Sequence, residues 1–292
     1  MSVTISGQFI ADKKLPDKAI DVMDVACARL RLKGITDGKI DHEEIIHEIS
    51  NMTGISIEQL SQKQASNLKT LEEKMKLQVF GQEKAINIIT DKILVARAGL
   101  KSLNKPVGSF LFLGPTGCGK TETARQLAKT LGVELIRFDM SEYQEKHSIA
   151  KLIGSPPGYV GFEDSQMGGG MFVNEVEKNP HAVVLFDEVE KAHRDVMTIL
   201  LQAMDDAVIT ASNGKKVKLN NSVILMTSNL GAEDMQANTL GFMENTSHDG
   251  EADINSFFSP EFRNRLDAVL RFKSLSKEVM DSIIDKFVAQ LN

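Results

Sequence analysis

The chain has 292 residues, of which 42% are hydrophobic and 25% are charged, ordinary proportions for a soluble globular protein. Its formal net charge of −6 and the lack of any apolar run near ~20 residues argue against a nucleic-acid or membrane partner. The two cysteines, Cys27 and Cys118, are too few for a disulfide scaffold, and no secretory signal opens the chain, so we expect a cytoplasmic protein.

Helical spacing dominates the first part of the chain. Residues 17–33 place apolar side chains at near-helical intervals, with Pro16 suited to the start of a helix and Gly34 to its end. Turn-rich segments separate this stretch from the next ones. Further helices are expected over 42–50, about 57–77 and 82–99.

Five short apolar runs then alternate with mostly helical stretches. Near-continuous apolar character indicates strands that are buried on both faces of a parallel sheet. The pattern predicts an α/β fold with a doubly wound, five-stranded parallel sheet, preceded by a helical segment. The runs are 109–113, 134–138, 182–186, 222–227 and 268–272. A polar segment, 232–256, interrupts the pattern and is expected to form a long loop.

The first apolar run is followed by a glycine-rich loop, Gly114–Thr121, with the pattern G-x-x-x-x-G-K-[ST]. In that pattern, backbone N–H groups between a strand and a helix form a cradle for phosphate. The positive end of the helix points at the same place. Lys120 is expected to reach the β- and γ-phosphates, and the Thr121 hydroxyl to hold Mg²⁺.

Polar residues that follow two other runs are candidates for the rest of the chemistry. Asp187 could bind the same Mg²⁺, and Glu188 could polarise the attacking water, although an exposed acidic turn is the alternative. Asn229 could bridge the γ-phosphate and that water, or it could simply form a turn.

Two more features suggest contacts with other chains. Arg263 and Arg265 are either surface charges or, in a ring of subunits, the source of an arginine finger that neutralises a neighbour's transition state. Tyr159 and Val160 lie between glycines, where an exposed apolar loop tip and a packed turn are the two alternatives.

The motifs together resemble the Clp-type AAA+ protein unfoldases, and most closely the ClpA-like branch. The matching segments cover residues from about 70 to 290. They are VFGQEKAI at 79–86, KPVGSFLFLGPTGCGKTE at 105–122, RFDMSEY at 137–143, LIGSPPGYVGF at 152–162, HAVVLFDEVEKAH at 181–193, MTSN at 226–229 and FFSPEFRNRLD at 257–267.

The resemblance implies roles for individual residues. Glu188, Asn229, Arg265 and Lys120 would be catalytic, with Arg263 the alternative arginine finger, and Thr121 and Asp187 would hold Mg²⁺. Tyr159 and Val160 match the pore loop that grips a substrate polypeptide. Leu240, Gly241 and Phe242 resemble the tripeptide that docks on a ClpP-like peptidase. ATP would contact Val79, Phe80, Gly114, Pro115, Thr116, Gly117, Cys118, Gly119, Lys120, Thr121 and Glu122.

The resemblance also implies a domain organisation. Residues 1–33 would be a helical remnant of a first module's small subdomain, 34–78 a linker with helices, and 79–292 the large ATPase subdomain of a second module. The family continues beyond Leu291 into a small helical lid, which we expect to be absent here.

The expected function is an ATP-dependent protein unfoldase and translocase, the ATPase component of a Clp-type protease, in which ATP hydrolysis drives substrate threading through a ring pore. Its partners would be protein substrates, a ClpP-like peptidase, and either five further copies in a homo-hexamer or a full-length unfoldase. Two alternatives are a truncated nucleotide-binding partner of a complete unfoldase ring and a ClpB-like disaggregase that works without a peptidase.

Overall fold

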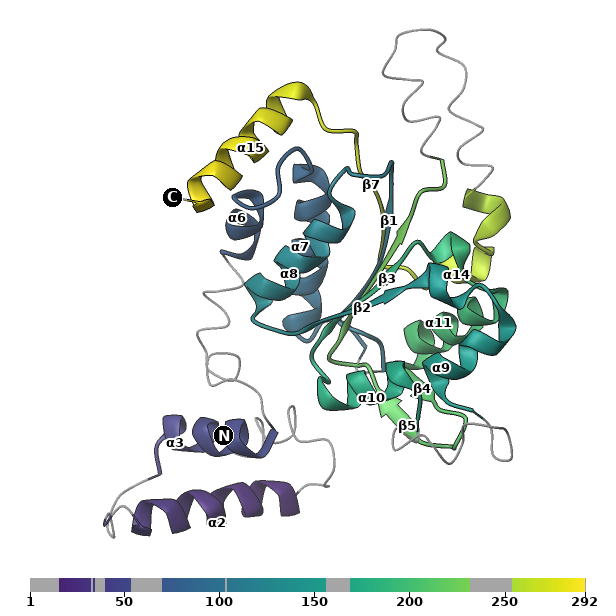
Figure 1. The fold of residues 1–292 in the computed structure, drawn as a ribbon. Helices are drawn as coiled ribbons and strands as arrows, with labels where there is room; N and C mark the ends of the chain where they lie inside the picture. The colour runs from purple at the N-terminus through teal and green to yellow at the C-terminus, as the bar shows by residue number, and fades with distance from the viewer. Residues whose placement is uncertain are drawn as a thin grey trace, which may run out of the picture. The chain divides into compact units, whose positions relative to one another are not determined.

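The computed structural model describes residues 16–32, 34, 40–53, 70–102, 104–155, 169–231 and 254–291. These residues belong to two compact units, which divide between Thr70 and Leu71. Figure 1 shows a helical first unit and a second unit built around a sheet.

The first unit contains two helices that pack against each other, α2 (Asp17–Leu32) and α3 (His42–Thr53). The buried side chains of α2 recur at helical intervals, as in Val22, Ala26 and Leu30, which gives the helix one apolar face. These bounds confirm the two helices that the sequence predicts over this region.

A parallel, five-stranded sheet forms the centre of the second unit. Its strands lie in the order β2-β3-β6-β1-β7, and every neighbouring pair is parallel. The five predicted apolar runs all become strands, with bounds that differ from the prediction by one residue at most at each end. The strands are β1 (Gly108–Leu113), β2 (Leu135–Asp139), β3 (Val183–Asp187), β6 (Val223–Ser228) and β7 (Ala268–Arg271).

Helices cover both faces of this sheet, which makes the fold doubly wound (Figure 1). One face carries α6 (Leu71–Lys76), α7 (Glu83–Arg97) and α8 (Lys120–Leu131). The other face carries α9 (Ile149–Ile153), α10 (Met171–Lys178), α11 (Arg194–Asp206) and α14 (Pro260–Asn264), with the short 3₁₀ turns η1 (Met140–Tyr143), η2 (Lys146–Ser148) and η3 (Val189–Lys191).

Successive side chains of each strand point to opposite faces of the sheet, so the sheet has a core of packed side chains on each face. Phe112 of β1 packs against Phe272, with their ring centroids 4.9 Å apart. On the opposite face, Phe138 of β2 and Phe186 of β3 meet Phe172 of α10, with centroids between 5.1 and 5.6 Å apart. The central strands β1, β3 and β6 are therefore buried on both faces, as the near-continuous apolar runs indicate, whereas the edge strands β2 and β7 keep exposed residues.

Two features of the second unit differ from the sequence prediction. A short antiparallel hairpin, β4 (Val208–Thr210) with β5 (Lys216–Lys218), was not predicted. The expected loop over 232–256 is wrong at its end, because residues 254–257 are helical and bury Ile254 in the core. The rest of that loop, like residues 57–69 of the predicted helix, lies outside the described residues.

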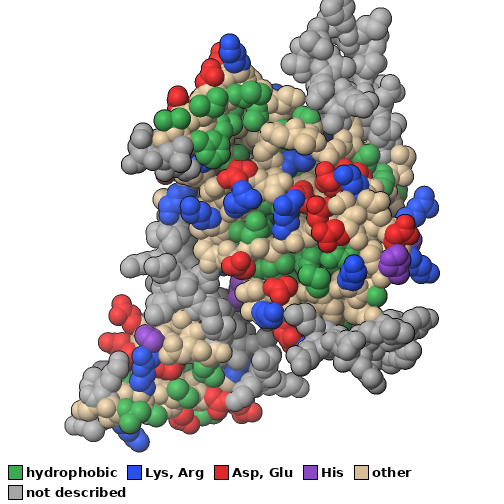
Figure 2. Space-filling view, viewed as in Figure 1, with side chains coloured by type: hydrophobic (Ala, Val, Ile, Leu, Met, Phe, Trp, Pro, Cys, Tyr) green, Lys and Arg blue, Asp and Glu red, His purple; other side chains and the backbone are tan. Residues whose placement is uncertain are grey.

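The last helix, α15 (Lys277–Leu291), presents an apolar stripe to the surface. Figure 2 shows hydrophobic side chains gathered over it, among them Met280, Ile284, Phe287 and Val288, which are 49–60% exposed. No helix among the described residues is both long and apolar enough to span a membrane.

Candidate functional site

The predicted phosphate loop lies between β1 and α8, at the carboxyl edge of the sheet. Gly114 has a φ of 152°, and a Cβ there would collide with the carbonyl oxygen of Phe272, so only glycine fits. Gly119 precedes the first turn of α8 with a left-handed φ of 98° and offers no side chain to cap the helix amides. The amides at the start of α8 therefore stay available to a ligand.

Lys120 is buried in this loop. Its ammonium donates to the carbonyl oxygens of Gly114 and Pro115 and, at 2.7 Å, to Oδ1 of Asn229. Burial lowers the pKa of Lys120 from its usual value, while the nearby Cys118 thiol and carboxylates act in the opposite direction. The loop thus holds its cation at a fixed place beside the end of β6.

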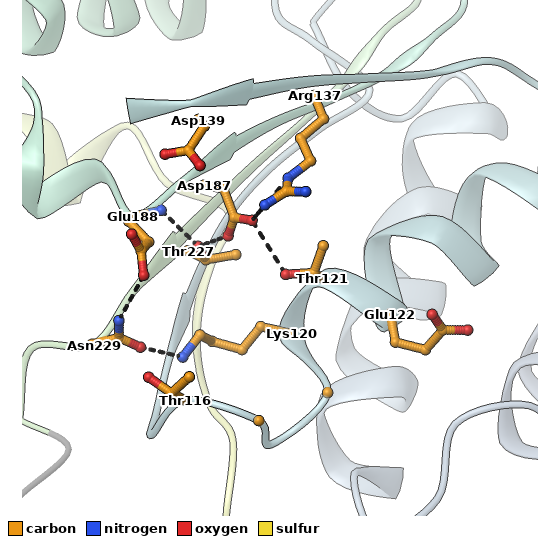
Figure 3. Close-up of a pocket in the computed structure, with 12 residues that line it drawn as sticks. Thr116, Lys120, Thr121, Glu122, Arg137, Asp139, Asp187, Glu188, Thr227 and Asn229 are labelled. Carbon is orange, nitrogen blue, oxygen red and sulfur yellow. Dashed lines mark hydrogen bonds and ion pairs between the residues drawn. The ribbon is translucent and has the colours of Figure 1, made fainter. Parts of the chain in front are cut away.

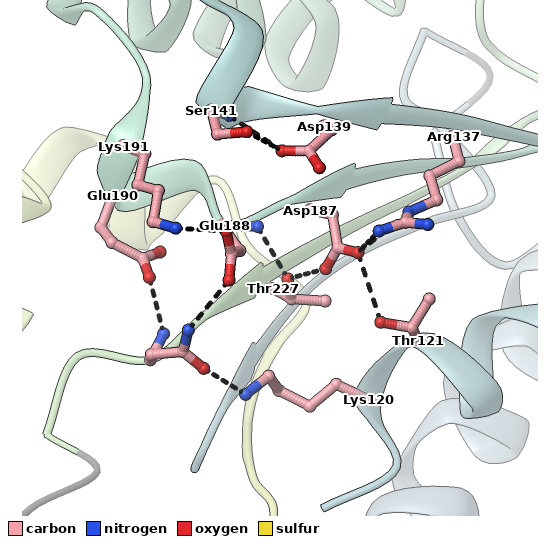
Figure 4. A network of polar contacts seen from close by, with 11 residues as sticks. Lys120, Thr121, Arg137, Asp139, Ser141, Asp187, Glu188, Glu190, Lys191 and Thr227 are labelled. Atoms are coloured by element: carbon pink, nitrogen blue, oxygen red, sulfur yellow. Dashed lines mark hydrogen bonds and ion pairs between the residues drawn. The ribbon is translucent and has the colours of Figure 1, made fainter. Parts of the chain in front are cut away.

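Asp187, the last residue of β3, is the centre of a polar network (Figure 4). Its Oδ2 accepts hydrogen bonds from Thr121 Oγ1 at 3.3 Å and from Arg137 Nε at 3.0 Å, with Arg137 Nη2 at 2.7 Å. Its Oδ1 accepts from the Thr227 hydroxyl. The parallel register explains this convergence, since all these residues lie near the strand ends at one edge of the sheet.

Glu188 follows Asp187 with a left-handed backbone, at φ 59°. Its N–H donates to Thr227 Oγ1 at 2.9 Å, and its carboxylate accepts from Lys191 Nζ at 2.6 Å and from Asn229 Nδ2 at 3.4 Å. The contact with Glu188 raises the pKa of Lys191. The tight turn directs the Asp187 and Glu188 carboxylates to different neighbours.

Asn229 connects the two halves of the site. Its side-chain oxygen accepts from Lys120, while its side-chain nitrogen donates to Glu188. Its backbone N–H donates to Glu190 Oε1 at 3.1 Å, which fixes the turn that follows β6. One amide therefore touches both the phosphate loop and the acidic pair.

These residues surround a pocket of about 390 Å³ (Figure 3). Four carboxylates and two cations line it, so its own side chains leave an excess of negative charge. The lining residues are Thr116, Gly117, Gly119, Lys120, Thr121, Glu122, Arg137, Asp139, Asp187, Glu188, Thr227 and Asn229.

Other residues of the predicted nucleotide site do not line this pocket. Gly114 and Pro115 meet Lys120 through their carbonyl oxygens, and Cys118 is buried. Val79 is buried, and Phe80 lies with its ring centroid 5.9 Å from the Lys286 ammonium of α15. The adenine contact stays a prediction for these last two residues.

A glutamine that the sequence analysis missed joins the segment after α6 to the phosphate loop. Gln82 donates to the carbonyl oxygens of Cys118, at 3.1 Å, and Lys273, at 2.8 Å, and accepts from the N–H of Lys273 at 3.2 Å. The chain stretches before α7 and after β7 are thereby held beside the loop.

The predicted arginine fingers lie elsewhere. Arg265 pairs with Asp205 of α11 at 3.1 Å, Arg263 donates to Asn255, and neither lines the pocket. Each has a buried Nε that finds no hydrogen-bond partner within the part of the chain that the structure describes. The predicted pore-loop and docking residues lie outside the described residues; they are Tyr159, Val160, Leu240, Gly241 and Phe242.

Four other polar residues at this edge of the sheet were not among the predicted site residues, namely Arg137, Asp139, Thr227 and Glu190. Arg137 and Asp139 lie at the end of the second apolar run, which becomes β2, the neighbour of β3. The rule that singled out residues after the third run could have found Asp139, whereas Arg137 lies inside the second run. Thr227 lies two residues before Asn229, inside an apolar run for which the sequence predicts only a buried strand.

Comparison with known proteins agrees with this geometry. The sequence profile of the AAA domain (Cdc48 subfamily) matches residues 105–269, and that of an AAA lid domain matches residues 1–77. The ClpA homolog protein of Fuscovulum blasticum is 48% identical over 99% of this chain and 36% of its own length. The chaperone protein ClpB of Staphylococcus aureus (strain N315) is 41% identical over 96% of this chain and 32% of its own length.

The fold also matches a solved structure, the extended conformation of the S. cerevisiae Hsp104:casein complex. The TM-score is 0.82 at 33% identity, over 99% of this chain and 50% of that one. The chain thus spans about a third of these curated relatives and half of Hsp104. Because the AAA profile covers more than half of the chain, the chain belongs to the AAA domain family, and it is similar to ClpA, ClpB and Hsp104.

Proposed function

We propose that the pocket at the carboxyl edge of the sheet binds ATP with Mg²⁺ and hydrolyses it, and that the protein uses this energy to unfold other proteins. One observation supports the site above all others. The phosphate loop, the end of β3 and the end of β6 bring Lys120, Thr121, Asp187 and Asn229 into one hydrogen-bonded network.

Phosphate binding would use the loop and the start of α8. The free amides at the start of α8 and the Lys120 ammonium would supply positive charge to the pocket. When phosphate arrives, Lys120 can exchange its contacts with carbonyl oxygens for contacts with phosphate oxygens, which carry more negative charge.

The metal would be held by Thr121 and Asp187. A hydroxyl and a carboxylate oxygen 3.3 Å apart are hard ligands of the kind that Mg²⁺ prefers. Among the described residues, no group of three or more His, Cys, Asp or Glu side chains could hold a metal alone. We therefore expect the metal to arrive with the nucleotide, where it would neutralise phosphate charge.

Hydrolysis would depend on Glu188 and Asn229. Glu188 would polarise a water molecule, and the Asn229 amide, which touches both Glu188 and Lys120, would orient that water against the terminal phosphate. The Glu188 carboxylate also accepts from Lys191 and Asn229, and its remaining lone pairs can accept a water molecule.

The variant Glu188→Gln tests the assignment. It should keep ATP affinity but lower ATP turnover by about 10²- to 10⁴-fold, because the amide is a poor base. Phosphate release and nucleotide binding are measured on the same samples. Glu175→Gln, at an exposed ion pair on α10, is the matched control and should leave turnover unchanged. Unchanged turnover in Glu188→Gln would contradict the assignment.

The remaining parts of the proposal concern the assembled protein. Similarity to ClpA, ClpB and Hsp104, the last solved with casein, supports a ring, a homo-hexamer or a co-assembly with a longer relative, that threads a protein chain along Tyr159 and Val160. In such a ring, Arg265 would reach a neighbour's nucleotide.

Coupling to a peptidase is a separate part of the proposal. Docking on a ClpP-like peptidase would use Leu240, Gly241 and Phe242. The 41% identity to ClpB favours disaggregation without a peptidase as the second candidate function. Association with a ClpP-type peptidase distinguishes the two.

A further inference from the structure

Arg137 binds the carboxylate that we assign to the metal. It projects from β2, the strand beside β3, and its Nη2 lies 2.7 Å from Asp187 Oδ2. The Arg137 side chain is 49% exposed, whereas that of Asp187 is only 8% exposed. Figure 4 shows Arg137 and Thr121 both pointing at this carboxylate.

The contacts are divided unevenly between the two carboxylate oxygens. Oδ1 accepts from Thr227, while Oδ2 accepts from Thr121 and from both Nε and Nη2 of Arg137. The oxygen that faces Thr121 is therefore the oxygen that the guanidinium occupies. A cation held between Thr121 and Asp187 would meet a second cation at the same atom, and the two would repel each other.

We propose that Arg137 is a positioning residue that holds Asp187 when no metal is present and releases it when Mg²⁺ arrives with the nucleotide. The inference rests on the proposed function of the pocket. The exposed side chain is free to turn toward solvent or toward Asp139, which lies two residues along the same strand and lines the same pocket.

Such a residue changes how strongly nucleotide binding depends on metal. Without metal, Arg137 neutralises Asp187 and reduces its repulsion of the phosphates. With metal, Arg137 competes for the carboxylate and weakens the complex. Removing the guanidinium reverses both effects, so the ratio of nucleotide affinity with Mg²⁺ to affinity without it should rise.

The experiment measures the affinity of the full chain for a fluorescent ADP analogue, once in excess Mg²⁺ and once in EDTA. In Arg137→Met the ratio of the two affinities should exceed the wild-type ratio by about threefold or more, a range set by the partial exposure of the pair. Arg137→Lys keeps the charge and should stay close to the wild type. Lys178→Met removes a positive charge from an exposed ion pair on α10 and should leave the ratio unchanged.

The outcomes separate this inference from the proposed function. A ratio that is equal to or below the wild-type value in Arg137→Met overturns the role of Arg137, while Mg²⁺-dependent binding by the wild type would still support the pocket. A wild type that binds no nucleotide in Mg²⁺ overturns both. Thermal melting checks that each variant folds. If the Met variant does not fold, Arg137→Gln, for which the same rise is expected, decides the question.

Discussion

At the scale of single residues, Glu188 has a backbone conformation that side chains with a Cβ rarely adopt, with φ at 59°. Such strain costs about 1–3 kcal/mol and persists only where neighbouring contacts impose it. Here the N–H of Glu188 is held by Thr227, and its carboxylate by Lys191 and Asn229. The strain turns Glu188 away from Asp187, so that two adjacent carboxylates can take different roles.

His181, in the turn before β3, should make stability depend on pH. Burial, with a smaller contribution from the charge of Arg97, lowers its pKa to about 4, against 6.5 when unfolded. Between these values the unfolded chain binds the proton first, so the free energy of unfolding falls as pH falls. At pH 5 this histidine should make it about 2 kcal/mol lower than at pH 7.

Urea unfolding of the wild type and of His181→Gln at pH 5 and pH 7 measures the contribution of His181 to the free energy of unfolding. The glutamine variant should lose less stability on acidification, and the difference between the two proteins isolates His181 from the other titrating groups. Equal losses in both proteins would show that the pKa of His181 is not lowered in the fold.

The sequence predicts much of the site because parallel strands end at one edge of a sheet. Lys120, Thr121, Asp187 and Asn229 each follow an apolar run, and they meet in the structure. The sequence could not show which strands are neighbours. The contact of Arg137 with Asp187 depends on β2 lying beside β3, which is a property of the strand order.

At the scale of elements, the junction of α9 and α10 depends on backbone contact. Gly170, which precedes α10, has a φ of 82°, and a Cβ there would collide with backbone atoms of Leu152, Ile153 and Gly154. The β4–β5 hairpin also contacts the end of α9. Ser212, in the turn of the hairpin, donates from its N–H to Ile153 O at 2.9 Å and from its hydroxyl to Gly154 O at 2.7 Å.

Gly170→Ala should therefore be much more harmful than an alanine at another glycine of similar φ. Gly214, in the β4–β5 turn, has a φ of 85°, and nothing lies within 4 Å of a Cβ there. We expect Gly214→Ala to cost about 1–2 kcal/mol of unfolding free energy, and Gly170→Ala about 1–3 kcal/mol more because backbone must move. Chemical denaturation of the two variants measures the difference, and equal costs would argue against the close contact.

Element prediction succeeded where the apolar signal is long and failed where it is short. The five strands of the parallel sheet have four to six residues each, and all were predicted. The strands β4 and β5 have three residues each, and in β5 the single buried Val217 lies between exposed lysines. The Asn213-Gly214 turn was the available signal for a hairpin, but the flanking strands are too short to show a clear alternation.

At the scale of the whole molecule, the proposed function depends on one nucleotide bound where the phosphate loop meets the acidic end of β3 and the neutral, polar end of β6. The proposed ring assembly, arginine finger and substrate threading all require that nucleotide site. The chain spans only about a third of the length of the ClpA and ClpB relatives. The pocket is also net acidic, so its affinity for a polyanion should depend on Lys120 and on metal.

Calorimetric titration of the full chain with ATP and Mg²⁺, for wild type and Lys120→Met, tests this claim most directly. The wild type should bind one nucleotide per chain. Loss of a buried, hydrogen-bonded cation should weaken that binding by at least about 30-fold. Wild-type affinity in Lys120→Met, with the variant folded, would contradict the assignment of the pocket.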